Sequence, residues 1–166
     1  MSRSFDVSAD STASIEQVHT AFSGEDYWQA RLATLHGAAA LESLTVDDDR
    51  TVRVVTTQDL GRDLLPGLLT KFYRRDLTVR HAETWRPTHG QLRGEISVAV
   101  SGAPGSGSGT ALIAPIHSGC RMTFTGIVEF KVPLVGGSVE TFIAREFTRE
   151  IPQIQRFTAT WITENA

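Results

Sequence analysis

The longest periodic pattern of the chain lies at its C-terminal end. From residue 137 to residue 165, large apolar side chains recur at intervals of three and four, which places them on one face of a helix. The apolar positions are Val139, Phe142, Ile143, Phe147, Ile151, Ile154, Phe157 and Trp161. A helix with so much apolar surface needs a second layer to cover it. The pattern therefore predicts a long amphipathic helix that packs on another element.

Upstream of this helix, apolar and polar residues alternate in short runs, as they do in half-buried strands. The predicted strands cover residues 5–9, 44–46, 52–56, 78–86, 92–100, 112–116 and 122–130. Two short helices interrupt them after the first strand: one has a capping box of Ser14 and Gln17, and one begins at Asp26 and ends at Gly37. We therefore predict an α+β fold with a seven-stranded, curved antiparallel sheet wrapped around the C-terminal helix, in a single domain of residues 1–166.

Two segments do not fit the strand pattern. Residues 61–73 place leucines and Phe72 at helical spacing but contain Pro66 and Gly67, which favours a short, weakly held helix inserted into the sheet. It is either a lid over an internal cavity or a fixed plug of the core. Residues 101–110 are rich in glycine and serine without the lysine of a phosphate-binding loop, so we expect a flexible hairpin connection there.

The bulk composition narrows the class of protein. The chain has 166 residues, 40% hydrophobic and 21% charged, which is typical of a globular domain. Its net charge of −3 disfavours nucleic acid as a partner, and no run is apolar enough to span a bilayer. The segment MSRSFDVSAD lacks the apolar core of a secretion signal, and Cys120 is the single cysteine. We expect a cytoplasmic protein that is a monomer or a weak homodimer.

Several stretches resemble a known bacterial family. SRSFDVSADSTASIEQVHTAF, DYWQARL, ETWRP, GEISVAV, APGSGSGTALIAP and KVPLVGGSVE are similar to domain-of-unknown-function family 2505. The order of elements, with VPLVGG leading into the last helix, resembles the START-like helix-grip (SRPBCC) superfamily over essentially the whole chain. The resemblance implies a sheet around a long helix with a pocket between them. It does not imply one activity, because that superfamily includes lipid and hormone binders, cyclases, dehydratases and oxygenase domains.

One strand carries the best candidates for chemistry. Val79 and Trp85 bracket His81 and Glu83 at period two, so all four should face the helix. An imidazole beside a carboxylate can act as a general base with its orienting acid, or serve as a polar handle for a ligand. If Thr78, Arg80 and Thr84 line the interior instead, this hypothesis fails.

The remaining lining of the predicted pocket is mainly apolar. The candidate ligand-binding residues are Thr56, Gln58, Leu68, Phe72, Tyr73, His81, Glu83, Trp85, Ile96, Val98, Met122, Phe124, Phe142 and Phe147. The histidines have no metal-ligand spacing and there is no cysteine cluster, so we predict neither a metal nor a cofactor.

The pattern favours one function and leaves two open. We favour binding or transport of a small hydrophobic or amphipathic molecule, such as a lipid, isoprenoid or polyketide-like compound, without catalysis. The first alternative is a cyclase- or dehydratase-like enzyme that uses His81 and Glu83 as an acid/base pair. The second is a protein-interaction module, which would expose a contiguous apolar patch.

Overall fold

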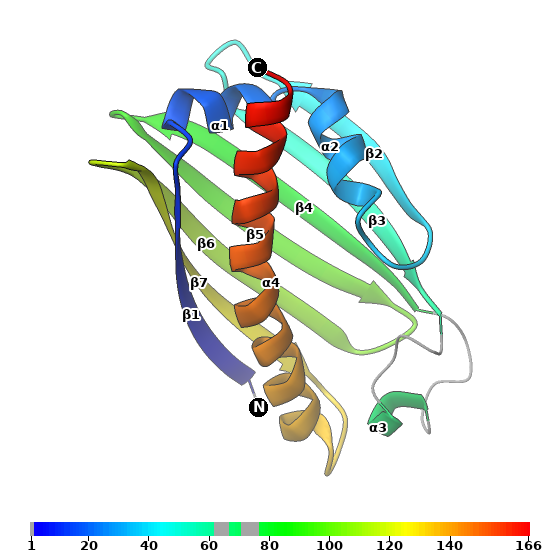
Figure 1. Cartoon of the computed structure of the whole chain (residues 1–166). Helices are drawn as coiled ribbons and strands as arrows, with labels where there is room; N and C mark the ends of the chain where they lie inside the picture. Colours follow the sequence, from blue (N-terminus) through cyan, green and yellow to red (C-terminus); the bar gives the residue numbers. More distant parts are fainter. Residues whose placement is uncertain (1, 62–66, 71–76) are drawn as a thin grey trace.

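The structure is a computed structural model that describes residues 2–61, 67–70 and 77–166. A seven-stranded antiparallel sheet curves around a long C-terminal helix, as the strand and helix patterns predicted (Figure 1). The order of strands across the sheet is β1-β7-β6-β5-β4-β3-β2. The strands are β1 (Ser2–Ser11), β2 (Ala39–Val46), β3 (Val52–Leu60), β4 (Leu77–Thr88), β5 (Gln91–Ser101), β6 (Gly105–Ile116) and β7 (Gly119–Phe130).

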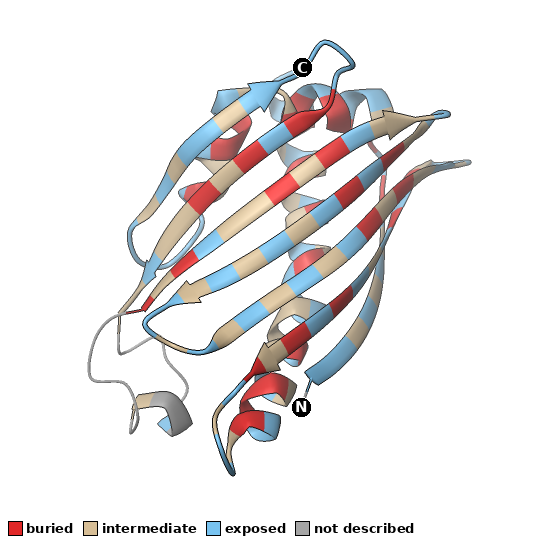
Figure 2. Cartoon of the chain, turned by 180° about the vertical axis from the view of Figure 1, so that it is seen from behind, coloured by how far each residue is buried: buried red, intermediate tan, exposed pale blue. Residues whose placement is uncertain are grey.

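Alternation of buried and exposed residues along the strands gives the sheet two different faces (Figure 2). The apolar positions face the concave side and pack against the helices, while charged positions such as Arg80 and Arg93 face solvent. Hairpin turns join most neighbours, whereas β1 pairs with β7, which lies more than a hundred residues later in the chain. The concave face is therefore the only face that can form a core.

Two short helices cover one end of the concave face (Figure 1). α1 (Ile15–Phe22) begins at the predicted capping box, in which the Ser14 Oγ accepts from the Gln17 amide and the Gln17 side chain accepts from the Ser14 amide. α2 (Glu25–Leu32) corrects the expected bounds. Its N-cap is Gly24 rather than Asp26, and it ends at Leu32. Gly37, the expected C-cap, lies instead in the loop to β2, where its φ is 83°.

The C-terminal helix, α4 (Gly136–Glu164), confirms the long amphipathic pattern. It lies along β1 and β7 rather than over the middle of the sheet. Its first turns are held to β7 by Glu140, a buried carboxylate that accepts a hydrogen bond from the Phe130 amide at 2.9 Å. This contact places the start of α4 at one edge of the sheet, so the helix runs over only part of the concave face.

The expected lid lies largely outside the described residues. Of residues 61–73, the structure describes Gly61 and the backbone of a short helix, α3 (Gly67–Thr70). Phe72 and Tyr73, and the side chain of Leu68, fall outside that description.

The prediction of a flexible connection at residues 101–110 is wrong, because most of this glycine-rich segment forms a strand. Only residues 102–104 turn, and β6 begins at Gly105 with full pairing to β5 and β7. Alternate glycines of this strand, among them Gly107 and Gly109, face the concave side. At Gly109, the ring of Phe124 on β7 occupies the space that a side chain would need. A packing requirement, rather than flexibility, accounts for the composition.

This packing predicts opposite effects for two matched substitutions in β6. A Cβ at Gly109 would lie 2.9 Å from the Thr125 carbonyl and closer still to Phe124, whereas at Gly107 its nearest neighbour, the Ile127 carbonyl, would be 3.5 Å away. We expect Gly109→Ala to lower the free energy of unfolding by about 1–3 kcal/mol, and Gly107→Ala to raise it by about 0.5 kcal/mol. Urea unfolding of both variants measures this, and equal effects would contradict it.

Candidate functional site

The concave side of β4 carries the polar residues that the alternation had singled out. Trp85 and Glu83 are buried, His81 is half-buried, and Arg80 points to solvent. The register pairs His81 with Thr56 on β3 and with Val98 on β5, while the next pair along β4 sets Glu83 between Val54 and Ile96. The structure therefore places the imidazole and the carboxylate on the same face, in consecutive inward positions.

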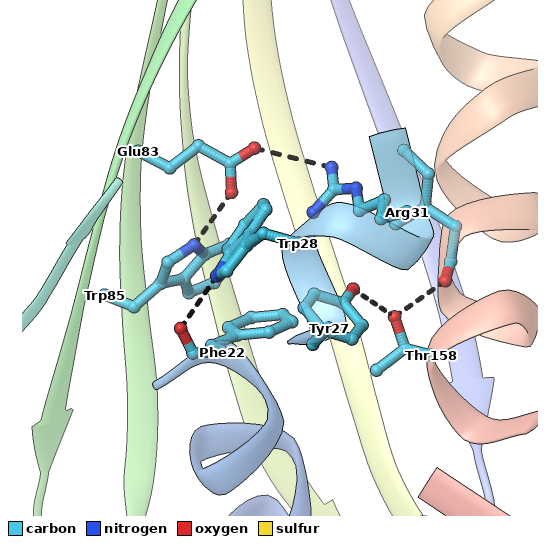
Figure 3. Close-up of polar contacts among 8 residues, drawn as sticks. Phe22, Tyr27, Trp28, Arg31, Glu83, Trp85 and Thr158 are labelled. Carbon is cyan, nitrogen blue, oxygen red and sulfur yellow. Dashed lines mark hydrogen bonds and ion pairs between the residues drawn. The ribbon is translucent and has the colours of Figure 1, made fainter. Parts of the chain in front are cut away.

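Glu83 is held by two donors, and one of them comes from a helix (Figure 3). The Trp85 indole donates to its Oε2 at 2.9 Å, and the Arg31 guanidinium of α2 donates to its Oε1 at 3.4 Å. The carboxylate is only 8% exposed, and a charge at that depth needs a partner. Both carboxylate oxygens are therefore engaged within the fold.

Arg31 is the member of the site that sequence reasoning missed. α2 presents it on the same face as Trp28, three residues earlier, and the guanidinium carbon lies 4.9 Å from the centre of that indole ring. Burial by itself would lower the pKa of Arg31, but the charge of Glu83, the Tyr27 oxygen and the hydrogen bonds to both together outweigh it, and the pKa lies above its usual value. An inward carboxylate at Glu83 requires a cation near it, but no sequence feature around Arg31 identifies this residue as that cation.

A hydrogen bond ties the same helix to α4. The hydroxyl groups of Tyr27 and Thr158 are 2.7 Å apart, and Thr158 also donates to the Ile154 carbonyl (Figure 3). Burial raises the pKa of Tyr27, so the phenol stays protonated at neutral pH. Through the separate contacts of Arg31 and Tyr27, α2 is thus linked both to β4 and to α4 at the end of the concave face that the short helices cover.

His81 is an inward polar group outside this network. Burial lowers its pKa, with the nearby charge of Glu83 opposing and that of Arg31 reinforcing the shift, so the imidazole is neutral at pH 7. Within the described part of the chain, neither ring nitrogen makes a hydrogen bond, although those of His19 do. A neutral imidazole offers one donor and one acceptor to whatever lies against the concave face.

The other predicted lining residues divide into groups. Thr56, Ile96 and Val98 are inward on β3 and β5, and the last two are only half-buried. The rings of Phe124 and Phe147 both stack on Phe5 of β1, with centroids 5.7 Å and 5.8 Å apart, so they fill the space under α4.

Three further predictions need adjustment. Met122 is buried in the main core, and Gln58 donates its side-chain amide to the His36 carbonyl at 2.7 Å, which fastens the loop before β2. Phe142 is 43% exposed, because it lies two positions from both Glu140 and Ala144 and therefore on the opposite side of α4 from these buried residues. It is not part of the concave lining.

The described residues contain no group of three or more histidine, cysteine, aspartate or glutamate side chains that could hold a metal ion. In the same residues, no helix has the length and apolar character to cross a membrane.

Comparison with known proteins gives a family and a fold. The family described as "Protein of unknown function (DUF2505)" matches residues 6–162. An uncharacterized protein of Mycobacterium tuberculosis (strain H37Rv) is 43% identical over 99% of both chains. Among solved structures, a protein of Thermus thermophilus has a TM-score of 0.58 at 14% identity and covers 100% of this chain and 99% of its own.

A second solved structure is a plant enzyme. Norcoclaurine synthase from Thalictrum flavum, in complex with dopamine and hydroxybenzaldehyde, has a TM-score of 0.52 at 15% identity, covering 100% of this chain and 89% of the other. Identities this low compare folds, and both matches agree with the START-like helix-grip architecture.

The buried ion pair predicts a strong coupling between α2 and β4. Removing one partner leaves the other charged and buried, so Arg31→Met or Glu83→Gln alone should lower the free energy of unfolding by about 3–5 kcal/mol. The double variant should cost less than the sum. The matched control is Arg53→Met, which breaks the exposed pair with Asp47 and should have a much smaller effect. Additive effects in urea unfolding would contradict the assignment.

The depressed pKa of His81 predicts a pH dependence of stability. Above the unfolded-state value of 6.5 the imidazole is neutral in both states, and below it the unfolded chain takes up a proton that the fold resists. Stability should therefore fall as the pH drops from about 7 to about 5. The melting temperature of His81→Gln should fall less over this range. Parallel curves for the two proteins would show that His81 does not carry the effect.

Proposed function

The chain belongs to the family described as "Protein of unknown function (DUF2505)", and from this premise we propose that it binds a small apolar or amphipathic molecule. The ligand lies against the concave face of β3, β4 and β5, beside α4. His81 and the Arg31–Glu83 pair stand at its polar end.

The observation that carries this proposal is a difference between two strands on one face. Inward residues of β7 such as Val128 and Phe130 are buried, whereas Ile96, Val98 and Val100 of β5 are only half-buried. Both sets are apolar and face the same side, but α4 covers the first set. Apolar side chains left half-covered on a concave face supply the surface that an apolar ligand needs.

The width of the sheet explains why this surface exists. Neighbouring strands lie about 4.8 Å apart, so the seven strands span roughly 29 Å. A helix is about 10 Å across and covers about two strands. α4 lies on β1 and β7, and α2 lies on β2, so none of the described helices runs along the length of the strands between them. The proposed ligand takes the place of that missing layer.

The polar groups describe the head of the ligand. Arg31 and Glu83 cancel in charge, and both oxygens of the carboxylate already accept hydrogen bonds. The Arg31 guanidinium has five N–H donors, and few of them donate to Glu83. With the neutral His81 beside them, the site favours a neutral head that accepts hydrogen bonds, such as a carbonyl or hydroxyl, over a quaternary amine.

The solved structures support a ligand-binding role at the level of the fold. One of them holds dopamine and hydroxybenzaldehyde, as its name states, in a protein of the same architecture. Its 15% identity extends neither its substrates nor its chemistry to this chain.

The two alternatives receive less support from the geometry. A cyclase- or dehydratase-like mechanism requires His81 and Glu83 to lie within hydrogen-bond reach of each other or of the ligand. Both oxygens of the carboxylate already accept hydrogen bonds from Arg31 and Trp85, which leaves Glu83 less available for proton transfer. A protein-interaction module would require a contiguous exposed apolar patch. The exposed large apolar residues of the described chain come from separate elements: Leu35, Val46, Ile127, Leu134 and Phe142. Binding without catalysis is therefore the better account.

Filling the concave face of β5 tests the proposal. Val98→Trp places a large side chain where the ligand would lie, and Ser97→Trp is the matched control because Ser97 faces solvent on the other side of the strand. Fluorescence titration with the neutral probe N-phenyl-1-naphthylamine should show binding weakened about tenfold or more in Val98→Trp alone. Circular dichroism checks that both variants fold. Unchanged titrations with folded Val98→Trp would refute the site.

A further inference from the structure

One end of the molecule combines an exposed apolar residue with a strained backbone. Residues 131–135, here called the basal loop, join β7 to α4, and Leu134 within it is fully exposed. Its φ is 70°, in the left-handed region that a leucine rarely adopts. Neither burial nor a favourable backbone conformation accounts for a leucine at this position. Such strain at an exposed apolar residue points to a use outside the fold itself.

Two open grooves meet beside this loop. The larger, of about 930 Å³, is formed by the basal loop and the first turn of α4, and the smaller, of about 350 Å³, lies between β1 and α4. Thr141 lines both, so they form one continuous surface. The first residues of β1, the basal loop and the start of α4 lie at the same end of the molecule, opposite to α1 (Figure 1).

This surface is positively charged although the chain carries a net charge of −3. Arg3, Arg145 and Arg149 line the smaller groove, and Lys131 lines the larger. Arg149 pairs with Glu146 and Lys131 with Glu129, but within the described residues Arg3 and Arg145 form no ion pair. By contrast, arginines elsewhere, such as Arg86 and Arg121, are mostly paired with acids. Two arginines without an ion pair in the described chain thus line the groove beside the exposed leucine.

We propose that this end docks on the surface of an anionic lipid bilayer. Leu134 enters the boundary between head groups and acyl chains, and Arg3 and Arg145 lie on the anionic head groups. A single apolar tip bordered by cations suits a lipid surface, whereas a protein partner of ordinary affinity needs a broader apolar centre. The docking goes beyond the proposed function: it brings the end of the concave face opposite to α1 to a source of apolar molecules, and it requires no bound ligand.

Vesicle flotation tests the charge component. The full-length protein is mixed with vesicles of phosphatidylcholine alone, or of phosphatidylcholine with phosphatidylglycerol. We expect binding to the mixed vesicles only, and a decrease as salt rises. Arg3→Gln and Arg145→Gln should each weaken binding about fivefold. The matched control is Arg93→Gln, an exposed arginine on the convex face without an ion pair in the described chain, which should bind like the wild type.

Leu134 allows a second test that separates docking from folding. Leu134→Gly relieves the strain of a φ of 70°, so its melting temperature should equal or exceed that of the wild type while vesicle binding falls about tenfold or more. Leu35→Ser, an exposed leucine in the loop between α2 and β2, is the control and should not alter binding.

Several outcomes would overturn the docking proposal. They are wild-type protein that stays in solution with both kinds of vesicle, equal binding to neutral vesicles, and variants of Leu134 and Arg145 that bind like the wild type. Because flotation needs no ligand and the N-phenyl-1-naphthylamine titration needs no vesicle, failure of one proposal is distinguishable from failure of the other.

Discussion

A single helix cannot cover a seven-stranded sheet, and the rest of this structure depends on that geometric limit. α4 is anchored at one edge by the Glu140 carboxylate on the Phe130 amide and by packing on β1. The apolar face of α4 is therefore buried against one side of the concave face. The same anchoring leaves the inward residues of β5 with a half-covered apolar surface. The half-covered strands and the position of the helix are two consequences of the same packing.

The covered end of the face is organised by a charge rather than by apolar packing. The charged side chain of Glu83 lies among tryptophans, where its burial would be destabilising without Arg31. α2 must therefore dock where the Arg31 guanidinium reaches the carboxylate. Tyr27, from the same helix, then joins α4 through Thr158. One buried pair therefore sets the distance between the sheet and two helices. Burial, rather than this pair, lowers the pKa of the neighbouring His81 and keeps it neutral, and its ring nitrogens make no hydrogen bond within the described residues, so they are open to a ligand.

The glycines of β6 show how local composition serves a distant contact. Phe124 lies over Gly109, and its ring in turn stacks on Phe5 beneath α4. A larger residue in β6 would displace this stack and with it the seat of the helix. At the basal loop the relation is reversed, since Leu134 contributes nothing to the packing and adopts a conformation better suited to glycine. Packing within the fold explains the glycines of β6, but it does not explain a leucine at position 134.

The sequence alone determined the elements, because apolar spacing of two and of three to four is imposed by strand and helix geometry themselves. It thus determined the sheet, the helix of residues 136–164 and the inward direction of His81 and Glu83. Tertiary structure decided which residue pairs with Glu83, since Arg31 is 52 positions away and nothing in its neighbourhood signals burial. It also decided that residues 105–110 form a strand, because the ring that requires glycine there belongs to β7. Contacts between distant segments have no period along a chain, and for that reason only the folded molecule shows them.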